Sequence, residues 1–224
     1  MDIGEHPVFR ALSPERRSDL FKEARTLSFH KGDLIYPPGG DFGRVYMLGE
    51  GEALVGRYSP SGARRMAVAV FRAGDIFGDL SFAPGLASND GETFAESLSD
   101  SRAFCLTTSA FARCVCEEKE ALVTLLTYLV RRLRKSEAKL GELAFCSVGE
   151  RLVRELVGWG KQAGSERRGG LVLDKPVTHE QLAAMVGASR ETVTDALRDL
   201  AKQGLVTTSG KRLVVSESLL QADD

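Results

Sequence analysis

The segment 178–206, THEQLAAMVGASRETVTDALRDLAKQGLV, constrains the fold of this chain more than any other, because it has the pattern of two short helices joined by a tight turn. Thr178 and, three residues later, Gln181 form a capping-box pattern that predicts the start of a helix. Gly187 predicts the end of that helix, and Ser189 predicts the N-cap of the next. Apolar residues at helical spacing predict the buried face of the second helix: Val193, Leu197 and Leu200. The segment is therefore expected to form a helix-turn-helix.

A β-hairpin is predicted directly after the second helix. Gly204 follows the last apolar residue of that helix and predicts its end. Two short runs of strand-forming residues, 205–208 and 212–215, then flank a turn at Ser209 and Gly210. Together these elements predict a winged helix-turn-helix domain.

The first residues of the second helix are polar, and this end of a helix-turn-helix reads base edges in the major groove of double-stranded DNA. The polar residues of this helix end, from which we expect the base contacts, are Ser189, Arg190, Glu191, Thr192, Thr194, Asp195 and Arg198. Arg190 offers two donors to guanine O6 and N7, and Glu191 can accept from the cytosine N4 amino group. A second group is expected to lie against backbone phosphates: Thr178, His179, Lys211 and Arg212. The alternative is an ordinary helical hairpin whose charged face meets only solvent.

Composition indicates an ordinary globular protein. A hydrophobic fraction of 43% and a charged fraction of 27% are typical of such proteins. The length of 224 residues is enough for two domains. The net charge of −1 means that a DNA-binding surface has to be local. The N-terminus lacks the pattern of a secretory signal, and the most apolar stretch, 121–130, is far shorter than the roughly 20 residues that cross a bilayer. We therefore expect a soluble cytoplasmic protein that does not contact membranes and keeps its cysteines reduced. These are Cys105, Cys114, Cys116 and Cys146.

The stretch from Leu27 to Thr107 alternates strand-like runs with glycine-rich turns. The runs LSFH, LIYP, VYML, EALVGRY, RMAVAVF and RAFCLT are separated by turns such as KGD, PPGG, GEG, SPSG and AGD. This spacing predicts an antiparallel β-barrel or jelly roll. A short helix is predicted ahead of it over 13–24, with Ser13 as N-cap and Pro14 at the first helical position.

The hydrophobic period changes to about 3.5 beyond Thr108, which indicates a long helix with a heptad seam. The seam residues alternate by four and three: Leu122, Leu126, Leu129, Leu133, Ser136, Leu140 and Leu143. A long helix has to bury such a stripe, and pairing with a second copy into a parallel homodimer is the simplest way to do so. The alternative is that the stripe packs on the β-barrel of its own chain.

The expected fold class is α+β, with three parts along the chain. A β-barrel over 1–107 is followed by a dimerisation helix over 108–144 and a winged helix-turn-helix domain over 145–224. Within the last part a helix is predicted over 149–160, and the polar run KQAGSERRGG after it is expected to be a loop. The segment 145–147 is expected to act as the hinge between the long helix and the DNA-binding part.

The run VGASRETV resembles the recognition-helix signature of the cyclic-AMP receptor protein and FNR superfamily, the CRP/FNR transcription regulators. The resemblance extends through GEGEALV, GDIFGDLSF and RRLRKSEAKLGELAF, and therefore covers nearly the whole chain. It implies a cyclic-nucleotide-binding barrel, base contacts from Arg190 and Glu191, and RNA polymerase as a further partner. One position departs from the pattern, because Asp195 stands where several members place a second base-reading arginine.

The effector site that the resemblance implies departs from the family's phosphate-binding cassette. Its residues here are Gly78, Asp79, Leu80, Thr93, Ser136 and Glu137. Glu92 stands where the family places an arginine against the cyclic phosphate. A carboxylate at 4 Å from a phosphate is repelled by roughly 1 kcal/mol even in bulk water. Cyclic AMP is therefore not the expected effector, and either another small ligand or no ligand takes its place.

Other sensor chemistries and functions find less support in the sequence. No cysteine precedes Cys105, which argues against an iron–sulfur cluster, and the spacing of Cys114 and Cys116 does not suit zinc. His6 and His30 are the candidates for a haem ligand, and thiol redox sensing is the other alternative. A jelly-roll metalloenzyme needs several histidine and carboxylate ligands, and the chain has only three histidines, so no catalytic or metal site is expected. A regulator that acts through protein contacts without specific DNA binding is the remaining alternative.

Overall fold

The computed structural model describes residues 3–40, 43–59, 61–62, 65–81, 92–167, 170–173, 177–209 and 212–216. The chain forms two compact units, Met1–Ser136 (unit 1) and Glu137–Asp224 (unit 2). The boundary between them lies inside one continuous helix, α4 (Lys119–Phe145). Across the described residues, no helix is both long enough and apolar enough to cross a membrane.

Unit 1 begins with short helices: η1 (Ile3–Glu5), α1 (Pro7–Arg10) and α2 (Pro14–Glu23). His6 is the N-cap of α1, and its Nδ1 accepts a hydrogen bond from the Val8 amide at 3.2 Å. Ser13 is the N-cap residue of α2, as predicted, but its side chain makes no capping bond. The Ser13 hydroxyl instead donates to the Glu118 carboxylate at 2.6 Å, which ties α2 to the turn ahead of α4.

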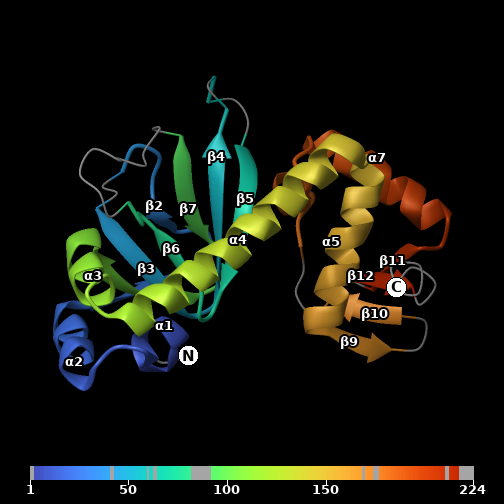
Figure 1. Cartoon of the computed structure of the whole chain (residues 1–224). Coiled ribbons are helices and arrows are strands. Elements are labelled where there is room, and N and C mark those ends of the chain that lie inside the picture. The colour runs from blue at the N-terminus through green and yellow to red at the C-terminus, as the bar shows by residue number, and fades with distance from the viewer. Residues whose placement is uncertain are drawn as a thin grey trace. The chain divides into compact units, whose positions relative to one another are not determined.

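The predicted jelly roll is confirmed as two antiparallel four-stranded sheets (Figure 1). The strands are β1 (Arg25–Phe29), β2 (Leu34–Tyr36), β3 (Arg44–Glu50), β4 (Glu52–Tyr58), β5 (Arg65–Arg72), β6 (Ile76–Gly78), β7 (Thr93–Ser97) and β8 (Ser101–Thr107). Their order is β1-β8-β3-β6 in one sheet and β2-β7-β4-β5 in the other. Side chains from both sheets form a shared buried core that includes Tyr46, Phe71 and Phe77.

Two helices follow the jelly roll where one was predicted. The first is α3 (Thr108–Val115), and a turn at residues 116–118 separates it from α4. Ala121 and Leu125 bury the first turns of α4 against the core of unit 1. The Tyr128 hydroxyl both accepts from the Ile76 amide and donates to the Ile76 carbonyl, each at 3.0 Å. These bonds fasten α4 to the start of β6.

Unit 2 is a winged helix-turn-helix, as predicted. Its elements after α4 are α5 (Val148–Ala163), β9 (Gly164–Arg167), β10 (Gly170–Leu173), α6 (His179–Val186), α7 (Arg190–Lys202), β11 (Val206–Ser209) and β12 (Arg212–Ser216). The strands form one antiparallel sheet in the order β11-β12-β10-β9, and the predicted wing hairpin is its β11–β12 pair.

The prediction of a loop over 161–170 is wrong for residues 161–167 and 170, whereas residues 168 and 169 lie outside the described residues. The helix α5 continues to Ala163, and the next residues form the edge strand β9, which pairs with β10 from Leu173↔Gly164 to Gly170↔Arg167. The run GSER shows no alternation of apolar and polar residues, so the sequence does not predict a strand there. Its partner strand, rather than its own sequence, determines its conformation.

Candidate nucleic-acid interface and sensor site

The helix α6 has the predicted caps at both ends. The Thr178 hydroxyl accepts from the Gln181 amide at 3.1 Å, and the Gln181 side chain accepts from the Thr178 amide at 3.0 Å. At the other end Gly187 adopts φ 66° and ψ 46°, a left-handed conformation that suits glycine. The turn into α7 therefore depends on Gly187.

The helix α7 presents its polar end outward because its opposite face is buried. The Ser189 hydroxyl accepts from the Thr192 amide at 3.1 Å and caps the helix. The predicted apolar face is buried in the core of unit 2: Val193, Leu197 and Leu200. Most of the proposed base-reading residues are exposed, and Thr194 is half-buried: the exposed ones are Ser189, Arg190, Glu191, Thr192, Asp195 and Arg198.

The charges on this face are organised before any partner binds. A hydrogen bond from its own amide and one from the Ser189 hydroxyl hold the pKa of Glu191 below its ordinary value, so this carboxylate is an acceptor at neutral pH. Arg198 and Asp195 form an ion pair at 2.7 Å. Asp195, which departs from the family pattern, thus neutralises a neighbouring arginine on the same helix.

The residues proposed to contact phosphates lie around this helix end or in the wing. Thr178 and His179 are exposed at the start of α6, and Arg212 is exposed at the start of β12. Lys211 lies outside the described residues. His179 Nδ1 lies 2.9 Å from the Thr194 hydroxyl, which joins the first turn of α6 to the outer face of α7.

Arg151 connects two parts of unit 2 from its interior, and no pattern in the sequence pointed to this residue. Its side chain is buried, at 7% exposed, on α5. Nε donates to the Val186 carbonyl at 2.8 Å, and Nη1 donates to the Cys146 carbonyl at 2.7 Å. One guanidinium therefore connects the end of α6 to the segment where α4 gives way to α5.

The outer face of α4 carries an apolar stripe with heptad spacing. Leu126, Leu133 and Leu140 are 52%, 58% and 65% exposed. Two further apolar residues of α4, Val123 and Val130, are also exposed and were not among the predicted seam residues. Leu122 and Leu143 are half-buried, and so is Leu129, which packs against the core of unit 1. We define the α4 stripe as Val123, Leu126, Val130, Leu133 and Leu140.

The first half of the predicted effector site is a tight turn after β6. Gly78 has φ 96°, and a side chain there would meet the Arg44 carbonyl. Asp79 is 8% exposed, and its carboxylate accepts from the Ser81 amide at 2.9 Å and from the Ser81 hydroxyl. Leu80 packs against the core of unit 1.

The remaining predicted effector residues are spread over two elements. Thr93 pairs with Arg57 across β7 and β4, and the preceding Glu92 forms an ion pair with the Arg57 side chain at 3.0 Å. Ser136 is exposed on α4 and its hydroxyl donates to the Arg132 carbonyl, while Glu137 is also exposed. The cassette residues 82–91 lie outside the described residues.

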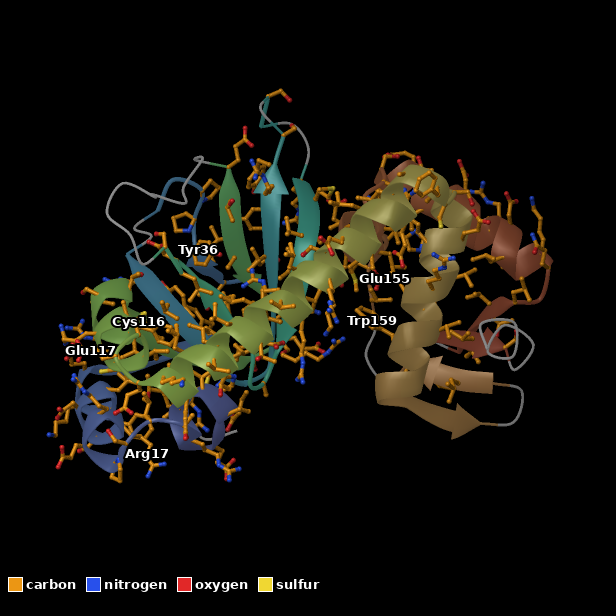
Figure 2. The ribbon with its side chains drawn as sticks, viewed as in Figure 1. Arg17, Tyr36, Cys116, Glu117, Glu155 and Trp159 are labelled. Carbon is orange, nitrogen blue, oxygen red and sulfur yellow. The ribbon has the colours of Figure 1, made fainter. Side chains whose placement is uncertain are left out.

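A stack of aromatic rings lines the jelly roll beneath Arg132. Tyr36 (Figure 2), Tyr46, Phe77 and Phe71 follow one another with ring centroids 5.8, 5.4 and 5.1 Å apart. The Arg132 guanidinium lies 4.7 Å from the Phe71 centroid in a cation–π contact. Burial raises the pKa of Tyr36 to about 12, so its phenol is neutral in this setting. The sequence offered no signal for this stack, because its rings come from four strands.

Among the histidines and cysteines considered for other sensors, His6, Cys105 and Cys114 are buried, whereas His30 and Cys116 are exposed and Cys146 is half-buried. His6 is buried against Phe9 and Tyr128, with Nδ1 engaged as a helix cap, whereas His30 is exposed beside Asp100. Cys105 and Cys114 are buried, and burial raises the pKa of the Cys114 thiol. A raised thiol pKa lowers the fraction of reactive thiolate.

The two units together define a DNA-binding transcription regulator with a cyclic-nucleotide-binding-like domain. Residues 26–117 match the cyclic nucleotide-binding domain family, and residues 150–221 match the Crp-like helix-turn-helix domain family. The chain belongs to the CRP/FNR family of transcription regulators.

Named relatives agree with this family. The chain is 31% identical over 212 residues to a CRP-like cAMP-activated global transcriptional regulator of Mycobacterium tuberculosis, covering 94% of this chain and 92% of the relative. It is 29% identical to a global nitrogen regulator of Synechococcus elongatus, covering 84% and 83%. The solved structure of the c-di-GMP responsive regulator CLP of Xanthomonas campestris has the same fold, with a TM-score of 0.78 at 20% identity over 91% of this chain and 99% of that one. The relatives are regulators rather than enzymes.

Proposed function

We propose that two copies of this chain bind a near-palindromic DNA site, with α7 of each copy in the major groove. The observation that carries the proposal is the amphipathic character of α7. Ser189 caps it, its apolar face is locked into the core of unit 2, and its polar leading end is exposed. A rigid helix that offers donors and acceptors at its N-terminal end fits the major groove.

Arg190 and Glu191 are the proposed readers of sequence. Arg190 would donate two hydrogen bonds to guanine, and the ionised Glu191 would accept from cytosine. Arg198, paired with Asp195, would reach a base only if that ion pair opens. Ser189, Thr192 and Thr194 are proposed to add base contacts from the same end of α7. Thr178, His179, Lys211 and Arg212 complete the proposed surface through phosphate contacts.

The proposed dimer forms along the α4 stripe. Apolar residues exposed at heptad spacing lose contact with water when a second α4 packs on them. A twofold axis along α4 would present the two recognition helices about one turn of DNA apart. In this proposal 1–107 senses, 108–144 pairs and 145–224 binds DNA, in the cytoplasm and with RNA polymerase as the further partner.

Arg190→Ala tests sequence-specific DNA binding. The site would first be selected from a random DNA pool with the wild-type protein. Losing the Arg190 contact is expected to cost roughly 1–3 kcal/mol per subunit and to relax the preference at one base position. Lys202→Ala, at the far end of α7, is the matched control and should retain affinity. A regulator that acts only through protein contacts would select no DNA motif and would not respond to Arg190→Ala.

Cyclic AMP is not the proposed effector, although the M. tuberculosis relative is named as cAMP-activated. At the position where the family places an arginine, this chain has Glu92, and Arg57 already neutralises it. Calorimetric titration with cyclic AMP should show no binding, and the nucleotide should leave DNA affinity unchanged. DNA binding that requires cyclic AMP would contradict this part of the proposal.

A further inference from the structure

A short chain of hydrogen bonds runs from α6 across α7. His179 Nδ1 lies 2.9 Å from Thr194 Oγ1, and Thr194 Oγ1 lies 2.8 Å from the Arg190 carbonyl oxygen. These contacts join the first residue of α6 to the base-reading end of α7. They also decide which nitrogen of His179 carries a proton.

The direction of each bond follows from the number of protons available. Both contacts can be hydrogen bonds at the same time in one arrangement only, because the Thr194 hydroxyl has a single proton and a carbonyl oxygen only accepts. In that arrangement the Thr194 hydroxyl donates to the Arg190 carbonyl and accepts from the Nδ1–H group of His179. A neutral imidazole has one N–H group, so neutral His179 carries a lone pair on Nε2.

We propose that His179 contacts a DNA phosphate through Nε2 and makes this contact only as an imidazolium, so that DNA binding takes up a proton. This inference rests on the proposed function. A phosphate oxygen accepts hydrogen bonds and is repelled by the Nε2 lone pair of the neutral ring. The cationic ring keeps its bond to Thr194 and gains an Nε2–H donor and a positive charge, and charge-assisted bonds are the stronger kind.

Other titratable and charged residues lie near His179 on both α6 and α7. Glu180 is next to His179 on α6. On α7 the groups around Thr194 are Arg190, Glu191, Asp195 and Arg198, of which the last two pair with each other. Glu191 is ionised well below neutral pH, so it does not titrate in the range where histidine does.

DNA affinity is therefore expected to rise as pH falls from 8 to 6. A dimer offers two such contacts, and we expect roughly ten- to hundredfold tighter binding of the selected site at pH 6. Each added phosphate contact also makes the slope of log K against log salt more negative by about 0.9. The wild-type slope should thus be steeper at pH 6 by roughly 1–2, which a purely structural role of His179 would not produce.

Three variants separate the protonation of His179 from other effects of pH. Binding would be measured by fluorescence anisotropy at pH 6, 7 and 8, each at several salt concentrations. His179→Gln should bind with weak pH dependence, and His179→Arg should bind tightly at every pH. Thr194→Val removes the acceptor of Nδ1–H, frees the neutral ring to carry its proton on Nε2, and should flatten the pH dependence.

The outcomes distinguish this inference from the function on which it rests. If wild type binds its site specifically but with the pH and salt dependence of His179→Gln, the proton-coupled contact is refuted and the DNA-binding proposal stands. If wild type and His179→Arg select no site at any pH, the proposed function itself fails. Stronger wild-type binding at pH 6 that His179→Gln lacks would support the contact.

Discussion

Arg151 shows how one buried side chain can define the geometry of a domain. Arg151→Met retains much of the apolar stem but leaves the Val186 and Cys146 carbonyls without this donor. We expect unit 2 to lose roughly 1–3 kcal/mol of unfolding free energy. The single tryptophan, Trp159, lies on α5 (Figure 2) and packs against the core of unit 2. Urea unfolding followed by its fluorescence would therefore report this loss.

Arg154 provides the matched control on the same helix. Its guanidinium is about half exposed and pairs with Glu142 at 3.8 Å. An exposed ion pair contributes little, so Arg154→Met should shift stability by less than about 1 kcal/mol. Equal losses in the two variants would mean that Arg151 acts through general packing rather than through its carbonyl contacts.

The burial of His6 predicts that acid destabilises the N-terminal segment of the fold. Burial lowers the pKa of His6 below its ordinary value of 6.5, with Asp75 opposing the shift. As pH falls below 6.5 the unfolded chain binds a proton at His6 before the folded chain does, so stability decreases. Above 6.5 both states are neutral there and the full stability remains.

The measurement is thermal unfolding at pH 8, 6.5 and 5.5 for wild type and His6→Asn. Asparagine keeps an acceptor at the N-cap of α1 but does not titrate. The variant should therefore lose less stability than wild type between pH 6.5 and 5.5. Parallel pH profiles would show that His6 does not contribute to the acid response.

At the residue scale, the sequence predicted the hydrogen bonds between residues that are close together along the chain. The capping bonds of Thr178 and Ser189 connect residues three apart, so a short run of sequence contains both partners. Arg151 bonds a carbonyl 35 positions away, and His179 meets a hydroxyl 15 positions away. Such pairs become visible only when the helices are packed.

Gly187 is the residue on which the joint between α6 and α7 depends. Gly187→Ala would place a Cβ in a left-handed conformation at a cost of about 1–2 kcal/mol. The strain also acts on the angle between the two helices, so DNA affinity should fall more than stability does. Gly187→Asn is the matched control, because asparagine tolerates this conformation better. Anisotropy with the selected site and thermal unfolding would measure the two effects, and equal affinity of Gly187→Ala and wild type would contradict the prediction.

At the element scale, strong local patterns predicted the helices and the long strands. Strands with a weak or no alternating pattern were not predicted. The strand β6 has three residues, and β7 buries two neighbouring residues, Phe94 and Ala95, instead of alternating. The strand β9 is polar and depends on β10. For α4 the heptad spacing fitted both Leu122 with Leu129 and Val123 with Val130. Only the burial of Ala121 and Leu125 against unit 1 shows which face stays open.

At the scale of the whole molecule, hydrogen bonds join the strand β6, which ends at Gly78 of the predicted effector site, to the helix α4. The Tyr128 hydroxyl on α4 forms hydrogen bonds with both the amide and the carbonyl of Ile76, two residues before Gly78. Arg132, one turn further, lies over the aromatic stack of the jelly roll. A ligand that moves β6 or Phe71 would therefore act directly on α4, the element proposed to pair the subunits.

Leu133→Asp tests whether the α4 stripe pairs two copies. Leu133 is 58% exposed in one copy, so the change should leave the fold of the subunit intact. In a parallel dimer the two new carboxylates would face each other in an apolar seam, which is strongly unfavourable. Light scattering should give a wild-type mass of about twice 24.3 kDa and a variant mass near 24.3 kDa. Lys135→Asp, exposed on another face of α4, should remain dimeric.

Because a single subunit holds only half of a palindrome, Leu133→Asp should also bind the selected site at least tenfold more weakly. A dimeric Leu133→Asp protein that binds DNA normally would show that the stripe is not the pairing surface.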